Sequence, residues 1–174
     1  MITGTNHAVL YVRDARRHRD FYADVLDFEP VVEDPDGAFV FLRAPGSSNH
    51  HDLACFTIGE QAAPSTAGRA QVGLYHLAWE VPTLGDLDDH RRRLEAAGAL
   101  AGASDHGVNK SLYARDPDGI EFEVMWLTPP ELWGDDEHRA IVRPLDLEGD
   151  LERYGRDRRS STRIERTPSV EEAR

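Results

Sequence analysis

Two histidines and one glutamate are the candidate metal ligands of this sequence. His7 opens a strand-like run at 7–12, and His76 opens a similar run at 76–81, 69 residues later because 76 − 7 = 69. Glu123 lies in a later run in which apolar and acidic residues alternate, as they do in a strand with one buried face. Two histidines and one carboxylate leave three adjacent positions of an octahedron open. That arrangement suits Fe(II) and O2 chemistry.

The elements that must position these residues occur twice. Each histidine-initiated strand is followed by a helix signal: Asp14 is an N-cap candidate in the first half, and Thr83 with Asp86 resembles a capping box in the second. Three strand-like runs then follow each helix, at 28–33, 38–42 and 53–58, and again at 101–104, 110–115 and 120–127. This repeated order predicts an α+β fold of two paired βαβββ modules. Matched positions could aim both histidines at one cavity; the plainer alternative is two packed core histidines.

The composition of successive segments predicts the domain boundaries. We expect a first module at 1–60, a linker of small residues at 61–72 and a second module at 73–127. Scattered apolar residues at 128–154 predict a C-terminal segment that wraps over the modules as one or two short helices. Charged and small polar residues dominate 155–174, which we expect to be a disordered tail.

Composition also limits the partners and the kind of metal site. The 174 residues include 40% hydrophobic and 30% charged residues, a normal globular mixture. A formal net charge of −12 argues against nucleic acid or an anionic membrane as the main partner. The sequence contains no run of eighteen apolar residues and no signal pattern, so we expect a cytoplasmic protein. Because Cys55 is the only cysteine, any metal must use histidine and carboxylate ligands.

Three of the eight histidines are expected to be ordinary surface residues. His18 and His90 lie in the middle of the two expected helices, among arginines and aspartates, and His138 follows an acidic run. Charged neighbours in the sequence are typical of a solvent-exposed helix face. This interpretation leaves His50, His51 and His106 to be explained.

The repeated histidines and the strand glutamate resemble the ligands of the vicinal oxygen chelate superfamily, over about residues 4–127. This superfamily includes glyoxalases, fosfomycin-resistance enzymes, antibiotic-sequestering proteins and type I extradiol dioxygenases. The resemblance implies that the sheets of the two modules curl into an open cup around a metal. In the extradiol dioxygenases, a histidine on the first strand of each module and a glutamate on the last strand bind the metal. Those positions are His7, His76 and Glu123 here, with Glu121 as the weaker alternative carboxylate.

Two further segments are similar to the extradiol dioxygenases in particular. The segment 49–54 resembles the one whose histidine acts in acid–base steps beside the metal, which implies this role for His51. The segment 105–113, with the Asp-Pro-Asp-Gly turn that follows it, resembles the catechol 2,3-dioxygenase signature. There, a tyrosine ten residues before the glutamate ligand binds a substrate oxygen, and a histidine contacts the substrate from farther away. The resemblance therefore implies a catalytic set of His51, His106 and Tyr113.

The implied activity is that of an extradiol ring-cleaving dioxygenase, which inserts O2 into a catechol-type aromatic diol at a non-haem Fe(II) centre. Mn(II) or another divalent metal is the alternative, the partners are the diol and O2, and a homodimer is expected by analogy. Two other functional hypotheses stay open: a glyoxalase-like metal-dependent isomerase or epimerase, and an antibiotic-binding resistance protein. Such isomerases take a fourth ligand, often glutamate, from the last strand of the first module, and here that run has no glutamate before Glu60.

Overall fold

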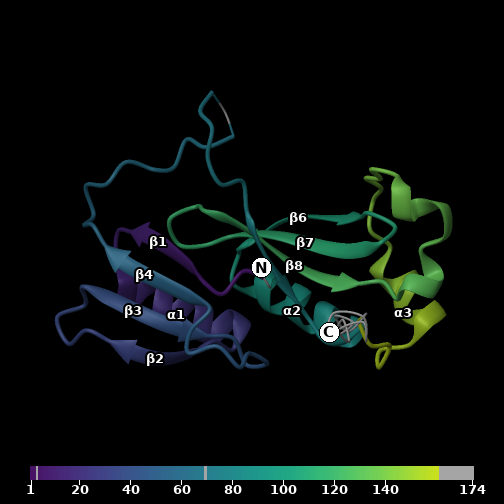
Figure 1. The fold of residues 1–174 in the computed structure, drawn as a ribbon, viewed down its shortest axis with the longest axis horizontal. Helices are drawn as coiled ribbons and strands as arrows, with labels where there is room; N and C mark the ends of the chain where they lie inside the picture. The colour runs from purple at the N-terminus through teal and green to yellow at the C-terminus, as the bar shows by residue number, and fades with distance from the viewer. Residues whose placement is uncertain (3, 69, 161–174) are drawn as a thin grey trace, which may run out of the picture.

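The computed structural model describes residues 1–2, 4–68 and 70–160, and it consists of two βαβββ modules (Figure 1). The first contains β1 (Ala8–Val12), α1 (Ala15–Leu26), β2 (Glu29–Glu33), β3 (Phe39–Arg43) and β4 (Leu53–Thr57). The second contains β5 (Leu77–Glu80), α2 (Leu84–Ala96), β6 (Leu100–Asp105), β7 (Asn109–Arg115) and β8 (Glu121–Leu127). The predicted order of elements and the α+β class are confirmed.

Each module has its own four-stranded mixed sheet. The strand orders are β1-β4-β3-β2 and β5-β8-β7-β6, so β1 and β5 are equivalent edge strands. The β1–β4 and β5–β8 pairs are parallel, and the other pairs are antiparallel. The first strand of each module therefore runs beside and parallel to the last one. The start of the first strand consequently lies close to the start of the last strand.

The helices begin where the sequence predicts. The Asp14 side chain accepts hydrogen bonds from the backbone N–H groups of Arg16 and Arg17, which would otherwise lack partners at the start of α1. Thr83 and Asp86 form a reciprocal capping box at the start of α2. These local contacts fix the direction in which each helix leaves its first strand.

The apolar faces of both modules join in one core. The rings of Tyr22 from α1 and Phe122 from β8 have centroids 5.9 Å apart, and those of Phe28 and Trp79 are 5.2 Å apart. The two helices lie next to each other (Figure 1), and His90 on α2 contacts the carbonyl of Val25 at 3.3 Å. The modules are therefore packed against each other through their helices and core residues.

The exposure predicted for His18 is wrong. Its side chain has 0% exposure, with Nδ1 3.0 Å from the carbonyl oxygen of Asp14 and Nε2 3.3 Å from Asp116 Oδ2. Burial lowers the pKa of His18, but the hydrogen bonds to Asp116 and Asp14 outweigh it and raise this pKa overall. His90 is also partly buried, and burial followed by the charge of Arg93 lowers its pKa. The charged neighbours of His18 in the sequence, Arg16, Arg17 and Asp20, lie on the exposed side of α1, away from its buried face.

The C-terminal segment packs on the second module (Figure 1). It contains the 3-10 turns η1 (Pro130–Leu132) and η2 (Gly134–His138) and the helix α3 (Leu147–Tyr154), whose first residue is buried in the core. The tail expected from residue 155 does not fray at 155–160. There, Ser160 N–H donates to the carbonyl of Pro82, and the carbonyl of Arg158 accepts from Trp126 Nε1. The predicted disorder of residues 161–174 falls outside the described part of the chain.

No helix among the described residues is both long enough and apolar enough to cross a membrane.

Candidate metal centre

The second module brings His76 and Glu123 together. His76 directly precedes β5, and the parallel register places its neighbour on the same face, Ala78, beside Glu123 of β8. His76 Nε2 lies 3.0 Å from Glu123 Oε2. Phe122 and Val124 point into the core, so Glu123 points to the opposite face of the sheet, as the alternation of the sequence predicts.

The surroundings of this pair fit a metal better than a simple surface ion pair. Glu123 is only 7% exposed, and Asn109 Nδ2 lies 3.4 Å from its other carboxylate oxygen. His76 Nδ1 is buried without a hydrogen-bond partner among the described residues. The imidazole nitrogen and the carboxylate oxygen that meet here are both ligand types that Fe(II) and Mn(II) accept. The weaker candidate, Glu121, is not the carboxylate in contact with His76.

A second pair of histidines lies on the first module. His7 precedes β1, His51 precedes β4, and the centroids of their rings are 4.5 Å apart. Phe41 of β3 stacks on His51 with centroids 4.7 Å apart and planes at 17°. His50 Nδ1 lies 3.1 Å from His51 Nδ1, so His50 is a hydrogen-bond neighbour of the ring. Burial, followed by the nearby rings of His7 and His50, lowers the pKa of His51.

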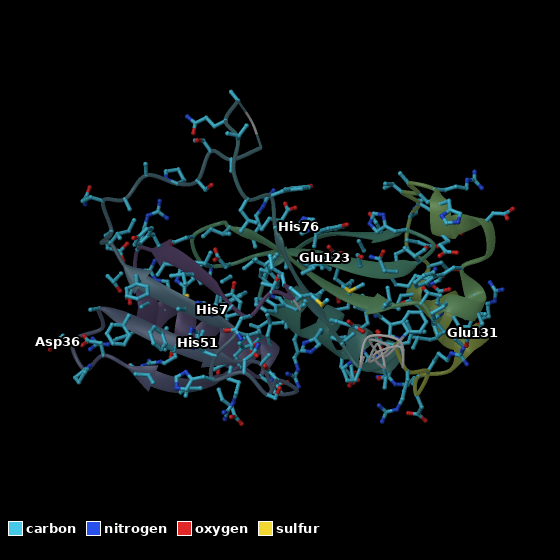
Figure 2. The ribbon with its side chains drawn as sticks, viewed as in Figure 1. His7, Asp36, His51, His76, Glu123 and Glu131 are labelled. Atoms are coloured by element: carbon cyan, nitrogen blue, oxygen red, sulfur yellow. The ribbon has the colours of Figure 1, made fainter. Side chains whose placement is uncertain are left out.

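The two pairs are separate in this arrangement of the modules. Figure 2 shows His7 and His51 on the first module and His76 and Glu123 on the second. Within residues 1–2, 4–68 and 70–160, no three histidine, cysteine or acidic side chains are grouped closely enough to hold a metal ion. The structure therefore assembles His76 with Glu123, and His7 with His51, but does not bring His7 to the other two expected ligands.

His106 and Tyr113 lie beside the His76–Glu123 pair. Tyr113 of β7 is the register partner of Glu123, and its ring centroid is 5.7 Å from that of His76. His106 Nε2 lies 2.8 Å from the Tyr113 hydroxyl. Burial, followed by the charge of Glu123, raises the pKa of Tyr113, so its hydroxyl keeps its proton near neutral pH.

Tyr75 is a neighbour of this group that sequence reasoning missed. Its ring centroid is 4.7 Å from that of His76, and the charge of Glu121 is the main reason that its pKa is raised. Tyr75 precedes the strand histidine in the sequence, and this adjacency was the one signal that could have pointed to it.

The repeat also identifies the position of an absent fourth ligand. The 69-residue offset relates Val9 to Ala78, because 9 + 69 = 78. Ala78 pairs with Glu123, and Val9 pairs with Ala54, so Ala54 occupies the position equivalent to Glu123 in the first module. A methyl group cannot bind a metal. The first module therefore has no carboxylate at the position equivalent to Glu123.

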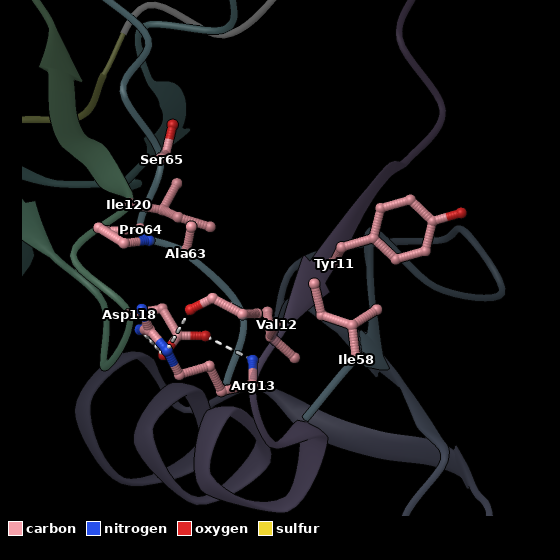
Figure 3. Close-up of a pocket in the computed structure, with 10 residues that line it drawn as sticks. Tyr11, Val12, Arg13, Ile58, Ala63, Pro64, Ser65, Asp118 and Ile120 are labelled. Atoms are coloured by element: carbon pink, nitrogen blue, oxygen red, sulfur yellow. Dashed lines mark hydrogen bonds and ion pairs between the residues drawn. The ribbon is translucent and has the colours of Figure 1, made fainter. Parts of the chain in front are cut away.

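A small pocket of about 170 Å³ lies at the junction of the modules, and none of the expected site residues lines it (Figure 3). Arg13 donates to Asp118 from its backbone N–H at 2.7 Å and from Nη1 at 2.9 Å. The rest of the pocket lining comes from β1, the linker and the turn before β8, and it includes Tyr11 and Ile120. The hydrogen bonds of Arg13 with Asp118 indicate a structural contact between the modules.

Comparison with known proteins agrees with this arrangement of fold and side chains. The model of the Glyoxalase/Bleomycin resistance protein/Dioxygenase superfamily matches residues 4–124, well over half of the chain. The chain belongs to this superfamily. A solved member, the glyoxylase/bleomycin resistance protein/dioxygenase domain from Frankia sp. EAN1pec, is 25% identical, with a TM-score of 0.62 over 74% of this chain and 100% of that one.

Two curated members of the superfamily are named as dioxygenases. Biphenyl-2,3-diol 1,2-dioxygenase 3 of Rhodococcus globerulus is 37% identical over 128 residues, which is 72% of this chain and 65% of that protein. Catechol-2,3-dioxygenase of Bacillus subtilis (strain 168) is 29% identical over 162 residues, which is 91% of this chain and 55% of that protein. The chain thus spans less than two thirds of the length of these relatives.

Proposed function

We propose that this chain is an extradiol ring-cleaving dioxygenase, which inserts O2 into a catechol-type aromatic diol at a non-haem Fe(II) centre. The observation that carries the proposal is the 3.0 Å approach of His76 Nε2 to Glu123 Oε2, with Tyr113 and His106 on the same side of the second module. The similarity to proteins named as diol dioxygenases supports it.

The proposed ligands are His7, His76 and Glu123. Fe(II) held by these residues would supply the Lewis-acid and redox chemistry that the reaction of a diol with O2 requires. His7 must approach the other two ligands, so we expect metal binding to tie the first module to the second. Burial raises the pKa of the Cys55 thiol to about 12, so this thiol stays protonated and is a poor ligand.

The remaining side chains of the site provide hydrogen bonds and proton transfer. His51 has a lowered pKa and is therefore neutral at pH 7, where it can take up a proton and return it. Tyr113 keeps its hydroxyl proton near neutral pH and can hydrogen-bond a substrate oxygen. Phe41 packs flat on His51 and limits the directions in which its imidazole can point.

The position of Ala54 favours this proposal over a glyoxalase-like isomerase. The isomerase hypothesis requires a fourth protein ligand from the last strand of the first module. Ala54 occupies the position of that strand that is equivalent to Glu123 in the second module. A metal-free antibiotic-binding protein would have no need for the contact between His76 and Glu123.

The proposal is tested with protein purified anaerobically and loaded with Fe(II) or Mn(II). Catechol, substituted catechols and biphenyl-2,3-diol are then added in air, while O2 uptake and the yellow ring-opened product are followed. We expect one O2 consumed per product formed, and loss of activity in His76→Ala. Tight metal binding with no O2 uptake on any diol would reject the dioxygenase and favour the isomerase. Sedimentation of the same samples tests the expected homodimer.

A further inference from the structure

Both ring nitrogens of His106 are engaged, one of them by the C-terminal segment. His106 lies in the turn between β6 and β7, and its Nε2 is 2.8 Å from the Tyr113 hydroxyl. On the other side of the ring, Nδ1 is 2.7 Å from the backbone carbonyl oxygen of Ile141. The family model ends at residue 124, so the residue that contacts Nδ1 lies outside the part matched by that model.

The Ile141 carbonyl determines where the proton of the neutral imidazole lies. A carbonyl oxygen only accepts hydrogen bonds, so Nδ1 must carry the hydrogen, and Nε2 is left with its lone pair. Nε2 then accepts, and the Tyr113 hydroxyl donates to it. With its hydrogen directed at His106, Tyr113 presents oxygen lone pairs to the site and can accept a hydrogen bond from a substrate hydroxyl. In the opposite tautomer, Nε2 would donate to the Tyr113 oxygen, and the direction of this hydrogen bond would be reversed.

The Ile141 carbonyl belongs to residues 136–143, which we name the strap. Contacts between the strap and the end of β6 hold this carbonyl in place. Arg143 and Asp105 exchange backbone hydrogen bonds of 2.9 Å in both directions, an isolated antiparallel bridge at the end of β6. The Arg143 guanidinium also lies 3.3 Å from the Asp105 carboxylate and 3.4 Å from that of Asp136. Through these contacts, Arg143 fixes both ends of the strap beside the turn that carries His106.

The turn is shaped to receive the strap. Gly107 has a φ of +78°, and a Cβ at this position would lie 2.6 Å from Asp136 Oδ2. The Gly107 N–H donates to Asp105 Oδ1 at 2.7 Å, and Lys110 Nζ lies 2.8 Å from the same oxygen. Glycine therefore allows both the backbone conformation and the close approach of Asp136.

We propose that the strap is a positioning element for the active site, and that Arg143 is a positioning residue acting through the Ile141 carbonyl and His106. The strap holds His106 in the tautomer with hydrogen on Nδ1 and so directs the Tyr113 hydroxyl hydrogen away from the substrate. The inference rests on the proposed function for its catalytic consequence, but the tautomer itself can be measured without any activity.

The first test is 15N NMR of histidine-labelled, metal-free protein at pH 8, with the His106 signals assigned from His106→Gln. We expect His106 to be protonated on Nδ1 and unprotonated on Nε2. In Arg143→Ala the protonation should shift measurably toward Nε2, and Arg143→Lys should restore part of the difference. Arg139→Ala is the matched control, because this exposed strap residue makes no side-chain ion pair among the described residues, and it should leave the spectrum unchanged. Wild-type protein with hydrogen on Nε2, or an Arg143→Ala spectrum identical to wild type, would overturn the proposal.

The second test is a double-mutant cycle on diol cleavage. Arg143→Ala should lower kcat/KM about tenfold, mainly through kcat, because a misdirected hydroxyl is a small displacement of a catalytic group. In a His106→Ala background, the same substitution should change kcat/KM less than about twofold. A full tenfold loss in both backgrounds would mean a purely structural role and would refute the proposal. If wild-type protein cleaves no diol, the proposed function fails, and the NMR measurement alone decides the role of the strap.

Discussion

Replacing His18 by glutamine is expected to lower the free energy of unfolding by about 3 kcal/mol. His18 is fully buried, its Nε2 lies 3.3 Å from Asp116 Oδ2, and neither atom has another hydrogen-bond partner among the described residues. The Asp116 side chain also has 0% exposure, so the substitution leaves a buried carboxylate without its cation. Breaking one side of a buried pair costs about 3–5 kcal/mol, a large share of the roughly 5–15 kcal/mol that stabilises a typical domain.

The assay is urea unfolding of wild-type and His18→Gln protein at several pH values, with the slope against urea checked for constancy. The folded protein raises the pKa of His18 above its usual 6.5. Its stabilising contribution is therefore complete below pH 6.5 and is lost as the pH rises through the raised value. The difference between the two proteins should thus be larger at pH 6 than at pH 9.

His90→Gln is the matched control with the opposite sign. Its pKa is lowered on folding, so the contribution of His90 is complete above pH 6.5 and is lost as the pH falls through the lowered value. This control should gain stability relative to wild type in acid. A cost of less than about 1 kcal/mol for His18→Gln, as for an exposed pair, or a cost that grows with pH, would refute the reasoning.

Three further predictions concern the metal, the reaction and the fold. Glu123→Gln should weaken Fe(II) or Mn(II) binding at least about tenfold in anaerobic calorimetry, whereas Glu121→Gln should change it less than about twofold; equal losses would reject the assignment of the carboxylate. Tyr113→Phe should lower kcat about tenfold to hundredfold with unchanged metal content, and an unchanged kcat would remove Tyr113 from the mechanism. Thr83→Ala should cost about 1 kcal/mol through loss of the capping box and lower Tm by about 2–4 °C; an unchanged Tm would mean that the cap contributes nothing.

The modules could be predicted from the sequence because their signals are local. Asp14 and Thr83 cap the helices that they precede, and the alternation around Glu123 identifies the face of β8 that points away from the core. The contact of His76 with Glu123 follows from the same kind of information, since both lie in one module and the parallel pairing of its first and last strands fixes their register. Within a module, sequence order is enough to place the side chains.

The contacts between modules could not be predicted in this way. Whether His7 can meet His76 and Glu123, as proposed, depends on how the two sheets lie relative to each other, and the repeat specifies only that the histidines occupy equivalent positions. The carbonyl of Ile141 that holds His106 is a backbone group, so no residue type marks it in the sequence. His18 was misjudged because the charges that matter for it are about a hundred residues away.

The Asp-Pro-Asp-Gly turn at 116–119 has the sequence of an ordinary turn, but in the structure it also contacts the first module. Asp116 faces the buried His18, and Asp118 accepts two hydrogen bonds from Arg13, so both carboxylates of the turn are bound by the start of the first module. Both contacts lie beside β1 and α1, and the same turn leads directly into β8. The turn therefore joins the strand that carries Glu123 to the module that carries His7. A change in the charge of His18 would alter its interaction with Asp116 in this turn. The stability of the fold is therefore connected to the relative position of the two modules, on which the meeting of the proposed ligands depends.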